Sequence, residues 1–165
     1  MADYYIWLYP HTDVPGNCQW STTGTYHYSE IDDPCVANDS LQTPSVTDYV
    51  DTMVESAVEE FWCVPPRGVR IVAARLNFYT KGGQGSEDLT GVNVLFTTAT
   101  GPAWLTAGTI GNVGTDWNWR YYEWTGLNKI HTQGECKFRL LSSMDKEGTR
   151  IYVAAAVVRL TINPE

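Results

Sequence analysis

The chain has 165 residues, of which 43% are hydrophobic and 18% charged, and its formal net charge is −8. This length suits one ordinary domain, and this balance is typical of a globular rather than a disordered protein. The chain contains 11 Lys and Arg residues but 19 Asp and Glu residues. This excess of acidic residues argues against nucleic acid and anionic membranes as partners, because binding to either requires clustered basic side chains.

Period-two alternation of apolar and polar side chains dominates the chain and predicts β-strands. Turn signals rich in Gly and Pro separate these stretches. In chain order, we expect strands over residues 3–10, 25–31, 48–53, 57–64, 70–80, 91–100, 103–110, 116–126, 136–143 and 150–162. Residues 50–62 would also fit an amphipathic helix, which the strand-rich flanks disfavour. The pattern predicts an all-β fold, a jelly-roll-like antiparallel β-sandwich, as a single domain over residues 1–165.

The first predicted strand carries apolar side chains on both faces. Tyr5, Trp7 and Tyr9 lie on one face, opposite Tyr4, Ile6 and Leu8. Such a strand either lies inside its own sheet or adds to the sheet of a neighbouring subunit. We therefore regard residues 1–20 as a candidate N-terminal arm or strand used in assembly. The same segment lacks a basic stretch followed by an apolar run, so we expect no signal peptide and folding in a cytoplasm.

The stretch "EIDDPCVANDS" holds the best candidate for a metal site. Asp32, Asp33 and Asp39 offer the hard oxygen ligands that Ca²⁺ prefers. A polar turn, in which Asp and Asn bond their own backbone, explains the same residues more simply. We therefore expect no metal and no obligatory cofactor.

Catalytic signatures are absent from the sequence. The three His residues are far apart and lack an HxH or HExxH spacing, and no GxSxG, P-loop or dinucleotide motif occurs. No two carboxylates can be paired from sequence alone, as a glycosidase would require. The four cysteines, Cys18, Cys35, Cys63 and Cys136, show no CxxC spacing, and a cytoplasmic setting favours thiols over two disulfides. We expect no enzymatic activity.

The stretch "DWNWRYYEWTG" concentrates aromatic side chains. As a strand, it puts Trp117, Trp119, Tyr121 and Glu123 on one face, which we expect to pack into the core. Tyr122 and Trp124 then point outward as assembly contacts, or as a ligand platform for a sugar with Arg120 as a hydrogen-bond donor. A one-residue change of register would exchange these faces.

The last predicted strand is apolar on both sides. Its core face carries Tyr152, Ala154, Ala156, Val158, Leu160 and Ile162. Its second face, Ile151, Val153, Ala155 and Val157, needs cover from a loop, the N-terminal segment or another subunit.

The order of "YSEIDDPCVANDS", "DWNWRYYEW", "GLNKIHTQG" and "TRIYVAAAVVRLTI" resembles small β-sandwich virion proteins of tailed bacteriophages. The resemblance covers most of the chain from Tyr28 onward and implies no catalytic residues. It implies a capsid decoration, or cement, protein on the virion surface, made in the host cytoplasm, with the major capsid protein as partner and a homotrimer as the assembled form. Tyr5, Trp7, Tyr9, Tyr122 and Trp124 are the candidate assembly residues. The alternative is a carbohydrate-binding or host-receptor-binding module of a phage tail, with a glycan as partner.

Overall fold

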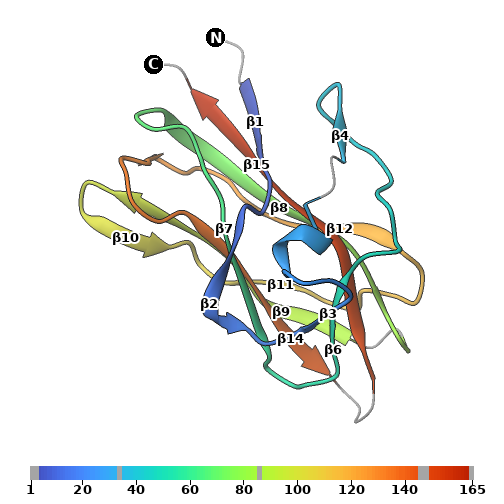
Figure 1. Cartoon of the computed structure of the whole chain (residues 1–165). Coiled ribbons are helices and arrows are strands. Elements are labelled where there is room, and N and C mark those ends of the chain that lie inside the picture. Colours follow the sequence, from blue (N-terminus) through green and yellow to red (C-terminus); the bar gives the residue numbers. More distant parts are fainter. Residues whose placement is uncertain (1–3, 33–34, 85–86, 145–148, 164–165) are drawn as a thin grey trace.

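Two antiparallel sheets pack face to face in the computed structural model, which describes residues 4–32, 35–84, 87–144 and 149–163 (Figure 1). The first sheet has seven strands: β1 (Tyr4–Leu8), β3 (Ser21–Thr22), β6 (Val50–Thr52), β8 (Arg70–Gly82), β12 (Asn118–Trp124), β13 (Lys129–Ile130) and β15 (Ile151–Asn163). The second has six: β2 (Thr12–Cys18), β7 (Val58–Trp62), β9 (Glu87–Thr98), β10 (Gly101–Trp104), β11 (Gly108–Ile110) and β14 (Lys137–Met144). The predicted all-β sandwich is confirmed.

Two small elements complete the described structure. A hairpin pairs β4 (Val36–Ala37) with β5 (Ser40–Leu41), and one 3₁₀ turn, η1, covers Tyr28–Glu30. The hairpin turns at Asn38 and Asp39, which both have positive φ, as the commonest two-residue hairpin loops require. The described part of the chain contains no helix long and apolar enough to cross a membrane.

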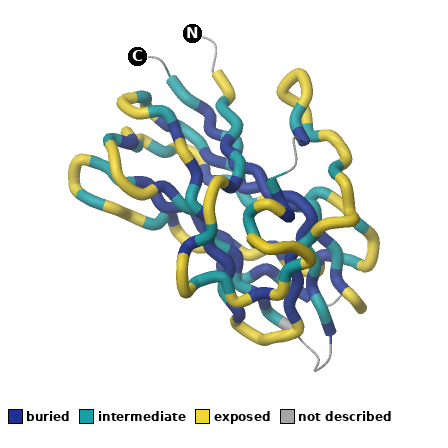
Figure 2. Tube along the Cα trace, in the orientation of Figure 1, coloured by how far each residue is buried: buried dark blue, intermediate teal, exposed yellow. Residues whose placement is uncertain are grey.

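The core lies between the sheets, and the buried residues of both sheets gather there (Figure 2). Phe61, Phe78, Phe96 and Phe138 are at most 1% exposed, and the rings of Phe61 and Phe138 lie 5.3 Å apart between centroids. All four phenylalanines lie in stretches that the sequence analysis predicted to be strands. The helix considered for residues 50–62 does not form, because that segment divides between β6 and β7 in different sheets.

Two local predictions are wrong. Residues 25–31 were expected as a strand, but they form a loop and η1, in which the backbone amides of His27 and Tyr28 donate to Asp13. The strand β2 was not expected, because Pro15 and Gly16 interrupt its sequence pattern and normally mark turns. Its register against β7 is broken between Asp13 and Cys18, which accommodates these residues.

A bulge in β15 explains another difference. The pairing of β15 with β8 shifts between Val153 and Ala155, so the residues on either side of the bulge exchange faces. Val153, Ala156 and Val158 therefore all point into the core. Tyr152, predicted on the core face, contacts Tyr49 and Trp117 instead, both edge to face.

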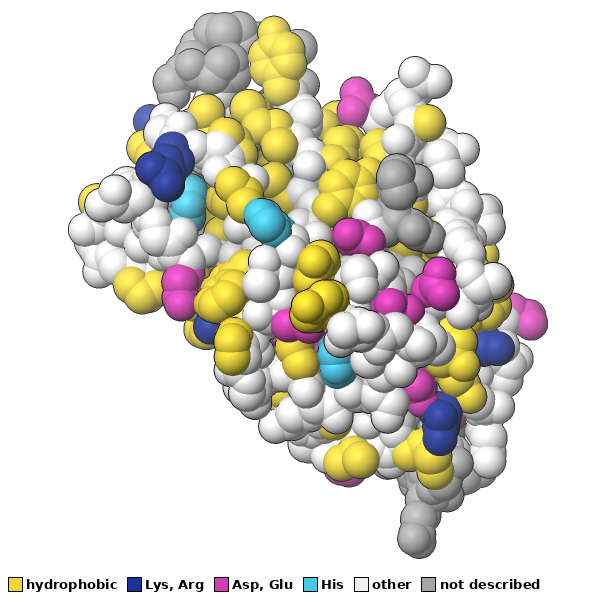
Figure 3. All heavy atoms as spheres, viewed as in Figure 1, with side chains coloured by type: hydrophobic (Ala, Val, Ile, Leu, Met, Phe, Trp, Pro, Cys, Tyr) yellow, Lys and Arg dark blue, Asp and Glu magenta, His cyan; other side chains and the backbone are white. Residues whose placement is uncertain are grey.

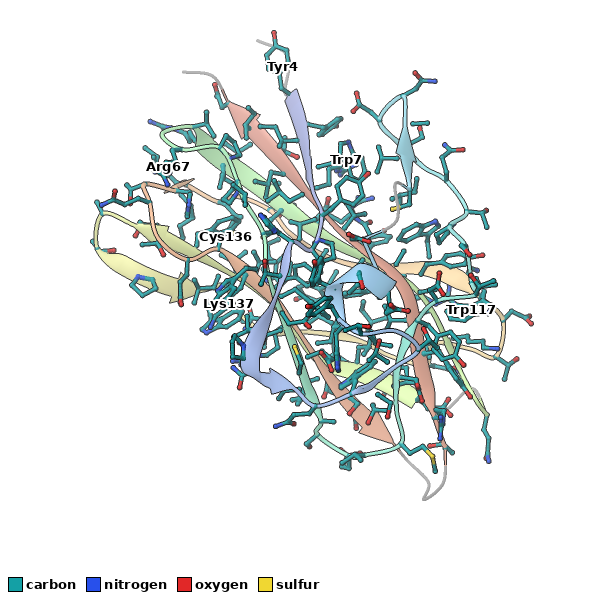
Figure 4. The ribbon with its side chains drawn as sticks, in the orientation of Figure 1. Tyr4, Trp7, Arg67, Trp117, Cys136 and Lys137 are labelled. Carbon is teal, nitrogen blue, oxygen red and sulfur yellow. The ribbon has the colours of Figure 1, made fainter. Side chains whose placement is uncertain are left out.

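The second apolar face of β15 is covered from within the chain. Ala155 and Val157 are fully buried in a separate cluster with Cys35, against which side chains of the β4–β5 hairpin and several aromatic side chains pack. The indole of Trp7 donates to Asp39 Oδ1 at 3.2 Å, and that of Trp119 donates to the Gln42 carbonyl at 3.1 Å. Figure 4 shows Trp7 between β1 and this hairpin. The predicted need for cover is thus met by a loop and by the N-terminal strand together.

The strand β1 pairs antiparallel with β15 of its own chain, from Tyr4 opposite Ile162 to Leu8 opposite Val158. Ile6 and Leu8 pack against the core, and Tyr5 and Trp7 point to the outer face of the sheet. β1 lies on one edge of β15, with the two described chain ends close together (Figure 1). Its use in assembly with another subunit stays a prediction.

Candidate functional site

The outer face of the seven-stranded sheet carries a row of polar and aromatic side chains across four strands. Strand order places β12, β8, β15 and β1 side by side. The register aligns Glu123 with Arg75, Arg75 with Arg159, and Arg159 with Trp7. Residues aligned in this way lie on the same face of a sheet. The row therefore runs straight across the strands.

One carboxylate holds both arginines of this row. Glu123 Oε1 accepts a hydrogen bond from Arg75 Nε at 2.9 Å and another from Arg159 Nη2 at 3.2 Å. The pKa of Glu123 lies below its usual value, mainly because Arg75 donates a hydrogen bond to the carboxylate. Partial burial raises the pKa, but the positive charges of Arg75 and Arg159 lower it further. Glu123 is therefore ionised at neutral pH and fixes the guanidinium groups in place.

Each arginine in turn lies over an exposed tyrosine ring. The Arg75 guanidinium carbon is 4.2 Å from the centre of the Tyr121 ring, and that of Arg159 is 4.6 Å from the centre of the Tyr5 ring. Tyr121 is 55% exposed and Tyr5 is 45% exposed. Cation–π contacts of this kind orient a ring that solvent would otherwise leave free to turn. We call Tyr5, Arg159, Glu123, Arg75 and Tyr121 the tyrosine–arginine platform.

A shallow hollow adjoins the platform where β1 ends. It is lined by Trp7, Tyr9, His11, Tyr28 and Asp32, among other residues. In Figure 3, hydrophobic side chains gather over β1 and toward the β4–β5 hairpin, with acidic and His side chains nearby. Trp7 contributes to the hollow and also lies 5.9 Å from the Arg159 guanidinium. Trp7 therefore links the hollow to Arg159 of the platform.

The structure brings together part of the predicted site and disperses the rest. Tyr5, Trp7 and Tyr9 share the outer face, as the sequence indicates. Tyr122 and Trp124 do not point outward, so the orientation predicted for them is wrong. Trp124 is only 8% exposed and its indole donates to the Thr106 carbonyl at 2.7 Å.

The reason lies in the pairing of β12 with β8. Tyr122 lies opposite Leu76 and Trp124 opposite Ala74, both on the core face of β8. Arg120 also points to this side, where it donates to the Val113 carbonyl at 3.4 Å, and it does not join a platform with Tyr122 and Trp124. Tyr121, expected in the core, is exposed.

The calcium candidates are not assembled by the structure. Asp39 accepts a hydrogen bond from Trp7 in the hairpin turn, and Asp32 lines the hollow. Asp33 lies outside the described residues. Among the described residues, neither Asp32 nor Asp39 belongs to a group of three side chains that could hold a metal.

A different set of side chains does form such a group. Cys18, His27 and Glu59 place one sulfur, one nitrogen and one oxygen atom within 4.8 Å of one another. Their spacing in the sequence gave no signal for this, because they come from β2, the loop before η1, and β7. Elsewhere, the buried sulfur atoms of Cys63 and Cys136 lie 3.2 Å apart. The redox state of the cysteines stays a prediction.

The sequence analysis also missed the platform arginines, Arg75 and Arg159. The only signal was a charged side chain within each of two strongly apolar strands, Arg75 in β8 and Arg159 in β15. Charged groups of this kind need a partner. That partner, Glu123, lies on a third strand.

Comparison with known proteins gives fold similarity alone. No model of a protein family and no curated protein matches the chain. A family 16 carbohydrate-binding module has 12% identity and a TM-score of 0.49, over 88% of this chain and 89% of that one. The CBM22-1 xylan-binding domain of Paenibacillus barcinonensis Xyn10C has 11% identity and a TM-score of 0.46, over 96% of both chains.

A phage protein also appears among the similar structures. The enzymatically active domain of bacteriophage CBA120 tailspike protein 4 has 13% identity and a TM-score of 0.42, over 94% of this chain and 19% of that one. Similarity at this level concerns the β-sandwich and identifies no ligand. The virion location, the capsid partner and the homotrimer stay predictions from the sequence resemblance.

Proposed function

We propose that this protein is a non-catalytic carbohydrate-binding β-sandwich module that binds a glycan chain on the tyrosine–arginine platform. The observation that carries the proposal is the pair of exposed rings, Tyr5 and Tyr121, each lying against an arginine on one sheet face. Flat aromatic rings offer the apolar surface on which sugar rings stack. Rings already oriented lose little conformational entropy when a ligand binds.

The polar groups between the rings suit sugar hydroxyls. Glu123 Oε2 receives no hydrogen bond from any described residue, so it can accept one from a hydroxyl group. The guanidinium groups of Arg75 and Arg159 can donate to ring or hydroxyl oxygens, and hydrogen bonds to charged groups are the stronger kind. Aromatic stacking with a few fixed polar contacts is the arrangement expected of a small-molecule site.

The separation of the rings indicates the size of the ligand. Tyr5 on β1 and Tyr121 on β12 are separated by β15 and β8. Three strand spacings of about 4.8 Å each give about 14 Å across the sheet, and the register offsets Tyr5 from Tyr121 by the four residues from Thr161 to Val157, which adds about 13 Å along the strands. One sugar ring cannot contact both tyrosines over this distance. The platform therefore suits an oligosaccharide or polysaccharide chain lying obliquely across the strands.

Affinity gel electrophoresis tests this proposal. The protein is run through gels containing xylan, mixed-linkage β-glucan, galactan or alginate. We expect at least one polysaccharide to retard the wild-type protein, and Tyr121→Ala to weaken binding about tenfold, a loss of about 1.4 kcal/mol.

The matched control is Tyr26→Ala, because Tyr26 is 57% exposed and lies outside the platform. The control should keep the wild-type retardation. Equal loss in both variants, or no loss in Tyr121→Ala, would contradict the proposed site.

A further inference from the structure

A second group of side chains lies apart from the platform, at the junction of β2, β7 and the loop before η1. Cys18 ends β2, and Glu59 lies opposite it on β7. His27 comes from the loop, which Asp13 holds in place by accepting hydrogen bonds from the His27 and Tyr28 backbone amides at 3.0 and 2.7 Å. Three segments of the chain therefore converge on one point.

Glu59 is the most buried member of this group, with a side chain that is 0% exposed. Its Oε1 accepts a hydrogen bond from the Trp20 backbone amide at 2.5 Å and lies 2.9 Å from His27 Nδ1. Its Oε2 is buried and has no hydrogen-bond partner among the described residues. A buried carboxylate oxygen without a partner is costly, so the site lacks a positive or hydrogen-bonding group at this position.

The thiol of Cys18 is poorly suited to act as a nucleophile. Burial, followed by the nearby carboxylates of Glu59 and Asp13, raises the pKa of Cys18 to about 12. A thiol held in its neutral form does not attack a substrate. A bound cation reverses this effect, since a coordinating thiol is deprotonated. The geometry suits a metal ion, because one donor atom from each of the three side chains lies within 4.8 Å of the other two.

The ligand types select the class of metal. One thiolate, one imidazole and one carboxylate are ligands of Zn²⁺ and of similar transition-metal ions, whereas Ca²⁺ and Mg²⁺ prefer oxygen alone. Three protein ligands leave a fourth position for water or for the second oxygen of Glu59. Cys18 and His27 are only partly buried, so an ion can reach them from solvent.

We propose that Cys18, His27 and Glu59 form a binding site for Zn²⁺ or a similar divalent transition-metal ion. Binding releases the thiol proton of Cys18 to solvent and forms a metal–sulfur bond. His27 binds through the lone pair of Nδ1, with its ring proton on Nε2. The ion supplies the missing partner of Glu59 and links β2 and the loop to β7.

Cobalt titration tests this site, because thiolate-bound Co²⁺ has a charge-transfer absorption in the near ultraviolet. Chelator-treated protein is titrated with Co²⁺, and Zn²⁺ is then added in competition. We expect one equivalent of Co²⁺ to produce the absorption and Zn²⁺ to abolish it. Cys18→Ser should lose the absorption, and His27→Gln should bind Co²⁺ at least tenfold more weakly.

The matched control is His11→Gln, because His11 is an exposed histidine outside the trio. It should titrate like the wild-type protein. Circular dichroism shows whether each variant is folded. If Cys18→Ser does not fold, the Co²⁺ affinity of His27→Gln tests the proposal instead. A wild-type protein without the absorption, or a folded Cys18→Ser that keeps it, would overturn the proposal. So would unchanged affinity in His27→Gln.

Discussion

Glu123 shows how one side chain organises a surface. It bonds two arginines that β8 and β15 bring side by side, and these arginines lie over Tyr121 and Tyr5. Two arginines without this carboxylate would repel each other at the aligned positions. The same acid therefore stabilises the sheet and sets the geometry of the platform.

The stability of the protein should depend on the ionisation of Glu123. Its folded-state pKa lies below the usual 4.5, mainly because Arg75 donates to the carboxylate. The ionised form therefore stabilises the folded state fully above about pH 4.5, and this contribution is lost as the pH falls through the lower folded-state pKa. Glu123→Gln should be less stable than wild type at neutral pH, and the difference should shrink in acid.

Urea unfolding followed by tryptophan fluorescence at several pH values measures this difference. Glu135→Gln serves as the control, because Glu135 is 53% exposed and lies 4.0 Å from Lys137. The control should follow the wild-type pH dependence. A constant difference between Glu123→Gln and wild type at all pH values would show that the ionised carboxylate is not the source of the stability.

At the level of elements, the orientation of β12 depends on its neighbours in both sheets. Its pairing with β8 turns Tyr122 and Trp124 toward the core. There the ring of Tyr122 lies directly against the backbone of Gly108 in β11. A side chain at residue 108 would occupy the space of the Tyr122 ring. Glycine is therefore required here because the ring packs closely against the backbone, and not because the backbone has an unusual φ.

Gly108→Ala should therefore destabilise the fold. The added methyl group would collide with the Tyr122 ring, and overpacking of this kind costs about 1–3 kcal/mol. At Gly111, by contrast, an added Cβ would meet only Asp88 Oδ1, at 3.7 Å. Gly111→Ala should change the free energy of unfolding by less than about 0.5 kcal/mol. Equal stability of the two variants in urea would contradict the inward position of Tyr122.

Across the whole molecule, strand locations were predictable where alternation was strong, as in β8, β9, β14 and β15. The faces were less predictable, because one bulge in β15 reverses the side on which Tyr152 lies. Which side chains of β12 point into the core depends on the register of β12 with β8, and no local sequence pattern predicts that register. The trio of Cys18, His27 and Glu59 could not be predicted, because only the fold brings its three segments together.

Residues, strands and sheet together support one central proposal, that a glycan chain binds across the outer face of the seven-stranded sheet. The most direct test is nuclear magnetic resonance of ¹⁵N-labelled protein titrated with oligosaccharides prepared from the four polysaccharides above. We predict the largest shifts in the Nε–H signals of Arg75 and Arg159 and in the amides of β1 and β12. No shifts with any of the oligosaccharides, or shifts confined to the six-stranded sheet, would contradict the claim.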